Sequence, residues 1–235
     1  MDPINGAALG REISSGLVGK LHFDFACQRG HAFNEAHIHS VIMEVLTARL
    51  DTSALAVHPN YALPALQPQP LSGRTPGRGR KRELDFAATG LAAPHEPALV
   101  IEAKWAGSSH ASASNIVRDV ARLAVASRAH PDAVCLFVLA GRTPDVQRIL
   151  AHKLLGPLGK KRRRILPYPY PQHAERLFHL VDTQGGQGLL SETDATWLRQ
   201  NFISPPHKLT STLYKPPAGV GTKWEAQIWR IKGYR

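Results

Sequence analysis

The chain has 235 residues, enough to bury a sizeable core in one large domain or in one domain with an appendage. It carries 29 Lys and Arg against 18 Asp and Glu, and its net charge of +11 indicates a polyanionic partner, most commonly nucleic acid. No apolar run approaches the roughly 20 residues that span a bilayer, and we find no secretory signal, so we expect no membrane partner. Two cysteines make no disulfide framework, which predicts a reducing, cytoplasmic setting.

Residues 1–30 are rich in glycine and weakly patterned, and we interpret them as an N-terminal extension in which residues 16–26 can hold one short strand. Four potential zinc ligands follow closely in the sequence: Cys27, His31, His37 and His39. Their spacing matches none of the paired-ligand patterns of structural zinc sites. We therefore interpret them as polar residues of a loop and of a helix start.

Residues 34–50 have the periodicity of an amphipathic helix, with Asn34 as its N-cap. Glu35 heads the apolar stripe of this helix, whereas Glu44 falls on the solvent side. An acid on an apolar stripe needs a reason, because burying an unpaired charge is costly. Glu35 either complements the helix dipole in the first turn or points at a site on a neighbouring sheet. Of the two glutamates we choose Glu35 as the site residue.

Residues 54–61 are predicted to form a first strand, and a loop rich in Pro, Gly and Arg follows it. A basic run of this kind is usually only a solvated loop. Here it leads directly into a strand that carries an acid, so we expect it to contact phosphates near a site. Its basic residues are Arg74, Arg78, Arg80, Lys81 and Arg82.

The most informative stretch is residues 82–107, in which two short apolar runs are interpreted as strands. Side chains alternate between the faces of a strand, so Glu102 and Lys104 project from the same side of the second run. Charged side chains such as these are rarely buried unless they are paired. We therefore expect Glu102 and Lys104 to be partners at a site.

The first run carries Asp85, with Leu84 and Phe86 expected together on the opposite face. A turn-rich connector at residues 89–97 joins the runs as a hairpin. If the core faces match, Asp85 approaches the acid–base pair of the second strand. Two carboxylates beside one ammonium suit a hard divalent cation and a phosphodiester. The alternative to a metal site is an ordinary hairpin whose polar face is exposed to solvent.

Beyond this hairpin, residues 113–129 have helical spacing and residues 133–140 form a continuous apolar run, typical of a strand buried on both faces. A strand, a helix and a strand over this length predict a crossover that pairs the two strands in parallel. The order from residue 34 to residue 141 is thus helix, strand, strand, strand, helix, strand.

This order, with Asp85 followed by Glu102 and Lys104 in Glu-x-Lys spacing and with Glu35 on an upstream helix, resembles the PD-(D/E)xK nuclease superfamily of restriction-endonuclease-like enzymes. One departure is that Leu84, not proline, precedes the aspartate. The resemblance implies an α/β fold with a restriction-endonuclease-like core, in which a central mixed sheet is flanked by helices in α-β-β-β-α-β order.

The resemblance also implies a metal-dependent endonuclease that hydrolyses DNA phosphodiester bonds. Asp85 and Glu102 would bind Mg²⁺, for which Mn²⁺ is expected to substitute, and Ala103 would lend its carbonyl oxygen. Lys104 would face the attacking water and the phosphate, while Glu35 would bind a second metal ion or orient water. Two alternatives stay open: a catalytically inactive nucleic-acid-binding module with the same fold, and an RNA-processing phosphodiesterase that uses the same acids.

The resemblance covers residues 31–142, which we interpret as the nuclease core, and residues 143–235 as a basic C-terminal extension packed on it. In this extension we expect helices at residues 143–155 and 191–202, and strands at residues 174–182 and 223–234. Further DNA contacts are expected from Ser108, Ser109, Asn115, Lys160, Lys161 and Arg162. Cleavage of both strands of a duplex would suit a homodimer.

Overall fold

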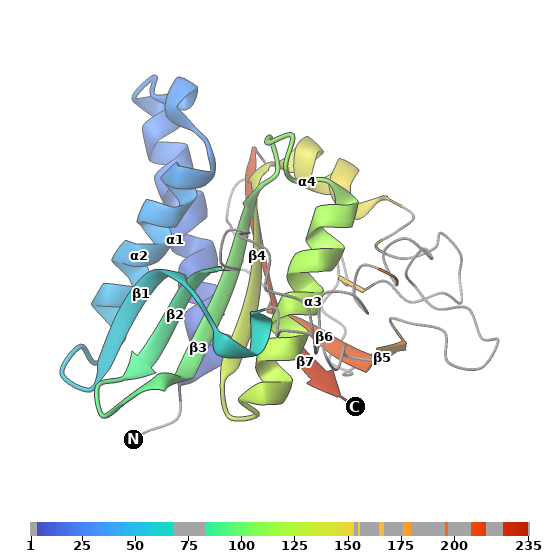
Figure 1. Ribbon diagram of the computed structural model, residues 1–235. Helices are drawn as coiled ribbons and strands as arrows, with labels where there is room; N and C mark the ends of the chain where they lie inside the picture. Colours follow the sequence, from blue (N-terminus) through green and yellow to red (C-terminus); the bar gives the residue numbers. More distant parts are fainter. Residues whose placement is uncertain are drawn as a thin grey trace.

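A seven-stranded mixed sheet with the order β1-β2-β3-β4-β7-β6-β5 organises the protein (Figure 1). The computed structural model describes residues 4–67, 83–152, 155, 165–166, 176–179, 196, 208–214 and 223–234. The strands are β1 Leu55–Tyr61, β2 Leu84–Gly90, β3 Ala93–Trp105, β4 Val134–Arg142, β5 Arg176–His179, β6 Lys208–Tyr214 and β7 Trp224–Tyr234. Strands β3 and β4 pair in parallel and the other neighbours pair antiparallel.

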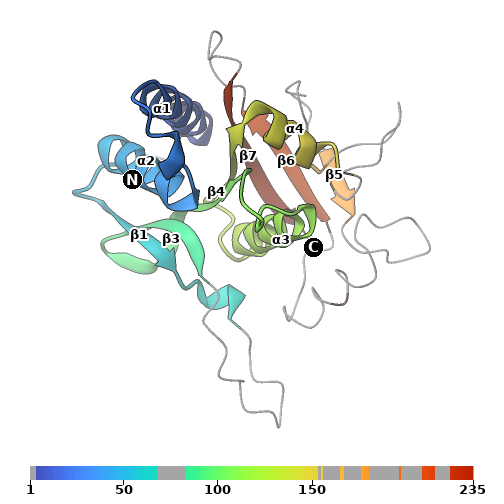
Figure 2. The same ribbon diagram turned by 90° about the horizontal axis from the view of Figure 1, so that it is seen from above.

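Helices cover both faces of this sheet, so the expected α/β class with a mixed sheet flanked by helices is confirmed. Figure 2 shows α1 and α2 on one side and α3 on the other. The helices are α1 Gly6–Ala26, α2 Glu35–Arg49, α3 Ala113–Ala129 and α4 Thr143–Leu150, with short 3₁₀ helices η1 Gly30–Ala32 and η2 Pro64–Leu66. None of the helices in the described part of the chain is long and apolar enough to cross a membrane.

The prediction of a short strand within residues 16–26 is wrong, because this segment belongs to α1. The side chain of Asn5 caps the helix by accepting a hydrogen bond of 3.0 Å from the N–H of Ala8. Apolar side chains then recur every three or four residues and are buried against the sheet, namely Leu9, Ile13, Leu17, Val18 and Leu21. This helical period extends over the whole element and prevails over the local alternation near its end.

Two hydrophobic clusters lie on the two faces of the sheet. On β3, Leu99, Ile101 and Ala103 pack in the cluster with α1 and α2, whereas Val100 packs in the cluster with α3 and α4. Strand β4 contributes to both clusters, and its residues from Val134 to Gly141 are all buried. The prediction of a strand buried on both faces, joined to β3 through α3, is therefore confirmed.

The connector expected at residues 89–97 is shorter than predicted, because β2 extends to Gly90 and β3 begins at Ala93. Its prolines are compatible with a strand because pairing of β3 with β4 begins only at Leu99, so that part of β3 is an edge. Register shifts in β2 next to Thr89 mark the irregular end of the hairpin.

Beyond residue 142, β7 confirms the strand expected at residues 223–234. The helix expected at residues 143–155 is present as α4, but it ends earlier than predicted, at Leu150. Strand β5 lies within the strand expected at residues 174–182. The helix expected at residues 191–202 lies outside the described residues apart from position 196. Strand β7 pairs directly with β4 from Trp224 to Arg230, so the last strand of the chain lies beside a central one.

Candidate active site

Strands β2 and β3 separate next to Asp85. Their registered pairs extend as far as Phe86 opposite Ile101. One residue earlier, Oδ2 of Asp85 accepts a hydrogen bond of 2.7 Å from the backbone N–H of Ala103. The carboxylate is thereby anchored to the middle residue of the Glu-x-Lys triplet, in the opening between the two strands.

The face alternation expected for the start of β2 is wrong. Leu84 belongs to the cluster on the α3 side, whereas Phe86 belongs to the cluster on the α1 and α2 side. Strict alternation is enforced only where both neighbours hold the backbone in register. Here the pairing with β3 has ended, and the Asp85 carboxylate accepts the amide hydrogen instead.

The ammonium group of Lys104 lies among carboxylates. Its Nζ donates a hydrogen bond of 3.2 Å to Oε1 of Glu35 and lies 3.6 Å from Oδ2 of Asp119. Burial lowers the pKa of Lys104, but the surrounding acids, led by Asp119 and Asp85, outweigh burial and raise the pKa above its ordinary value. Lys104 therefore remains a positively charged donor throughout the neutral range.

Glu35 reaches this site because it is the first residue of α2. The N-cap is Asn34, whose side chain accepts a hydrogen bond of 2.9 Å from the N–H of His37, as predicted. Figure 1 shows that α2 begins, β3 ends and α3 begins toward the upper side of the view. Glu44 lies further along the helix and is exposed. The predicted helix phase agrees with this arrangement.

Glu102 is the most deeply buried acid of the site, with 1% of its side chain exposed. Its Oε1 lies 2.9 Å from Nη2 of Arg122, but neither carboxylate oxygen has a partner with the geometry of a hydrogen bond. Burial, followed by the nearby charge of Asp119, raises the pKa of Glu102 well above its ordinary value. Oε1 therefore has an ion-pair contact without a hydrogen bond, and Oε2 has no hydrogen-bond partner.

Two residues of α3 complete the cluster and were not found from the sequence. Asp119 is 6% exposed, and its Oδ1 accepts a hydrogen bond of 2.5 Å from Nη2 of Arg122. Burial raises the pKa of Asp119. A signal for it existed, because Asp119 lies on the apolar stripe of α3 between Ile116 and Leu123. The same argument that identified the acid on α2 could have been applied here.

His39 lies one turn after Glu35 on α2 and also faces the opening. Its Nε2 is 3.6 Å from Oδ2 of Asp85, and its ring packs edge-on against Phe86 with centroids 5.2 Å apart. This histidine, assigned from the sequence to a loop or helix start, thus belongs to the site. It supports the Asp85 side chain from the side opposite α3.

Of the residues expected to contact DNA, three lie in the described part of the chain. Ser108 and Ser109 follow the end of β3, and Asn115 lies in the first turn of α3, where its side chain donates a hydrogen bond of 3.0 Å to the carbonyl oxygen of His110. They therefore lie next to the end of the strand that carries Lys104. The others lie outside the described residues, namely Arg74, Arg78, Arg80, Lys81, Arg82, Lys160, Lys161 and Arg162.

The donor set at this site suits a hard divalent cation. The described residues contain no group of three or more His, Cys, Asp and Glu side chains already arranged to hold a metal ion. Mg²⁺, however, commonly takes one or two carboxylates and completes its shell with water and substrate oxygens. Asp85 and Glu102 provide two carboxylates, and the oxygens of Glu102 are buried without hydrogen bonds.

Comparisons of the chain with protein-family models, with curated proteins and with solved structures found no match.

Proposed function

We propose that this protein is a metal-dependent nuclease that hydrolyses DNA phosphodiester bonds, an endonuclease with a restriction-endonuclease-like core and a PD-(D/E)xK site. The observation that carries the proposal is the meeting of Asp85 from β2, Glu102 and Lys104 from β3, and Glu35 from α2. These side chains come from three elements and lie at the opening between two strands.

Asp85 and Glu102 are the residues that would hold Mg²⁺ or Mn²⁺. When bound, such an ion polarises a phosphate oxygen and lowers the pKa of a coordinated water. The chain contributes the placement of the two carboxylates. Asp85 is held by the amide of Ala103 at 2.7 Å, and Glu102 is held by its position within β3 between two buried neighbours.

Lys104 supplies fixed positive charge for the phosphate. Its ammonium can stabilise the negative charge that develops on the phosphoryl oxygens during attack. Glu35 and Asp119 contact the ammonium from two sides, at 3.2 Å and 3.6 Å, and so determine its direction. We assign Glu35 the role of a positioning residue that acts through Lys104.

The charge of the whole chain supports a polyanionic substrate. A net charge of +11 favours association with the phosphate backbone independently of base sequence. Ser108, Ser109 and Asn115 lie beside the end of β3, where their polar groups can contact a strand that enters the site.

Nicking of a supercoiled plasmid tests this function. We expect nicking with Mg²⁺ or Mn²⁺, no nicking with EDTA, and no nicking by Lys104→Ala, because the developing charge then lacks its donor. Lys208→Ala on β6 is the matched control and should cleave as the wild-type protein does. DNA retention by Lys104→Ala should persist, since a single contact is lost from a strongly basic protein.

Cleavage by Lys104→Ala at the wild-type rate would contradict the mechanism. A wild-type protein that binds DNA but never cleaves it with either metal would instead identify a binding module. Cleavage of RNA and not DNA would identify a ribonuclease that uses the same acids.

Glu35→Gln and Glu44→Gln separate the site glutamate from a neighbour on the same helix. We expect Glu35→Gln to lower the nicking rate at least about tenfold, as is typical of the loss of one oriented group at a site, and Glu44→Gln to leave it unchanged. The assignment would be reversed if Glu44→Gln were the impaired variant.

A further inference from the structure

A protein cation already lies beside the most buried carboxylate of the site. Nη2 of Arg122 is 2.9 Å from Oε1 of Glu102 and also contacts Oδ1 of Asp119. Nη1 of the same guanidinium lies 3.5 Å from the carbonyl oxygen of Glu83. A single guanidinium thus bridges carboxylates from the sheet and from α3, while 21% of the arginine side chain is exposed.

The contact with Glu102 neutralises charge without satisfying the geometry of the carboxylate. Neither oxygen of Glu102 has a partner aligned for a hydrogen bond, although both are buried. An arginine cannot lose its charge in a protein, so it is a permanent cation at this position. An ion coordinated through Oε1 of Glu102 would compete with this guanidinium for the same oxygen.

Asp119 offers the guanidinium another partner. Residues 119 and 122 are three apart on α3, and their side chains are joined by the hydrogen bond to Oδ1. The other oxygen of Asp119, Oδ2, lies 3.6 Å from Nζ of Lys104. Arg122 can therefore leave Glu102 and remain bound to Asp119, which also keeps its contact with Lys104.

We propose that Arg122 is an internal counter-ion that competes with the divalent cation for Glu102, so that metal binding requires its displacement toward Asp119. This inference rests on the proposed function, because it takes Glu102 as a metal ligand. In the metal-free protein Oε1 of Glu102 is then paired with Arg122. Release of the guanidinium on metal binding would leave it at the partly exposed edge of the site, close to where a phosphate would lie.

Mn²⁺ binding without DNA tests the competition directly. The affinity of Mn²⁺, measured at pH 8 by electron paramagnetic resonance of the free ion, is compared between the wild-type protein and Arg122→Met. Met keeps a long side chain in the packed space but removes the charge. Because a unit charge this close to a ligand repels a divalent ion strongly in a partly buried site, we expect binding at least about tenfold tighter in Arg122→Met.

The chain contains a matched control for this substitution. Asp145 and Arg148 on α4 have the same spacing and a distance of 3.1 Å, but the Arg148 side chain is 70% exposed. Arg148→Met should bind Mn²⁺ as the wild-type protein does. Arg122→Lys, which keeps the charge, should remain close to the wild-type affinity and so distinguishes charge from packing.

Equal or weaker Mn²⁺ binding by a folded Arg122→Met would overturn the proposal. If that variant does not fold, an NMR titration of the wild-type protein with Mg²⁺ tests the proposal instead. Mg²⁺ should shift the side-chain Nε–Hε signal of Arg122 and not that of Arg148. An unmoved Arg122 signal at saturating Mg²⁺ would also overturn it. Glu102→Gln separates the two hypotheses, because Mn²⁺ binding that is unchanged by Glu102→Gln would refute the metal role of Glu102, on which the proposed function depends.

Discussion

The charge of Glu102 should make the stability of the metal-free protein depend on pH in one direction. Burial, followed by the neighbouring Asp119, raises the pKa of Glu102 well above its ordinary 4.5. Between the ordinary and the raised pKa, the folded protein holds a proton that the unfolded chain has lost. The free energy of unfolding therefore falls as the pH rises through this window.

Glu102→Gln removes this penalty, because glutamine has nearly the shape of the protonated acid and does not ionise. Each pH unit between the two pKa values corresponds to about 1.4 kcal/mol of the free energy of unfolding. The variant should match the wild-type protein near pH 4. Above the ordinary pKa it should exceed the wild-type free energy of unfolding, by a difference that grows with pH until the raised pKa is passed.

Urea denaturation in EDTA, followed by tryptophan fluorescence at several pH values, measures this difference. Asp145→Asn is the control, since it removes the same charge from an exposed pair with Arg148 that solvent screens. A difference between Glu102→Gln and wild type that stays constant with pH, or that shrinks as the pH rises, would refute the reasoning.

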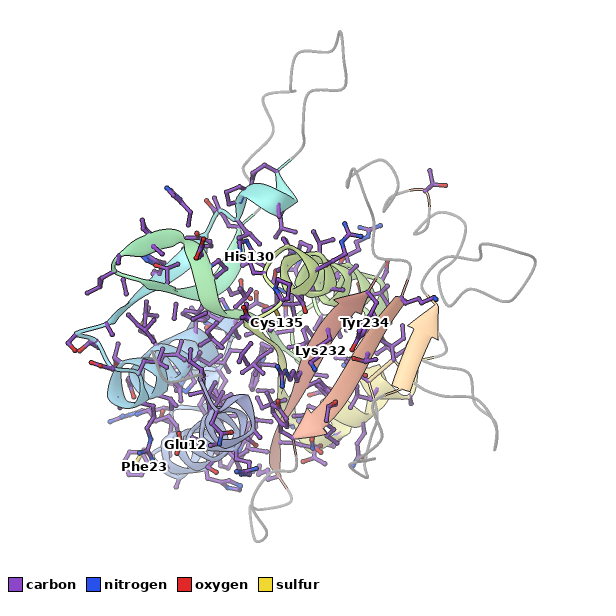
Figure 3. The ribbon with its side chains drawn as sticks, turned by 90° about the horizontal axis from the view of Figure 1, so that it is seen from below. Glu12, Phe23, His130, Cys135, Lys232 and Tyr234 are labelled. Atoms are coloured by element: carbon purple, nitrogen blue, oxygen red, sulfur yellow. The ribbon has the colours of Figure 1, made fainter. Side chains whose placement is uncertain are left out.

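Four further outcomes are expected. A Cβ at Gly233 would overlap the carbonyl oxygen of Ala124 and lie 2.7 Å from its carbonyl carbon, so Gly233→Ala should lower the free energy of unfolding by about 3 kcal/mol. Gly19→Ala has nothing within 4 Å of the new Cβ and should raise it by about 0.5–1 kcal/mol, and urea denaturation checks both. Burial raises the pKa of Cys135 to about 12, and this thiol lies in the interior (Figure 3), so a thiol reagent should modify Cys27 alone until denaturant is added. DNA affinity measured by fluorescence anisotropy should fall linearly on a log–log plot against salt, and an affinity independent of salt would contradict a phosphate-binding surface.

Sequence patterns that extend over only a few residues were sufficient to predict where several side chains of the site lie. Asn34 caps α2 with its own side chain, which places Glu35 in the first turn. Glu102 and Lys104 share a face of β3 because successive side chains of a strand must alternate. The β3–α3–β4 unit likewise follows from the apolar patterns of three consecutive segments.

The sequence-based predictions were wrong at two places. At one, a short pattern competed with a longer period; at the other, contacts with a distant part of the chain determined the face on which a side chain lies. The alternation near the end of α1 favours a strand, but the helical period of the whole element prevails. Leu84 and Phe86 fall in different clusters because the pairing of β2 with β3 ends beside them. A strand's period is reliable only while its neighbours hold the register.

The sequence by itself therefore determined which residues lie on which side of α2 and β3, since helix and strand geometry are local properties. Only the tertiary structure decided what surrounds them. Arg122 meets Glu102, and Asp119 meets Lys104, because α3 packs across the face of β3. The direction and distance of such ion pairs depend on how separate elements are placed in space, and no periodicity within either element encodes that placement.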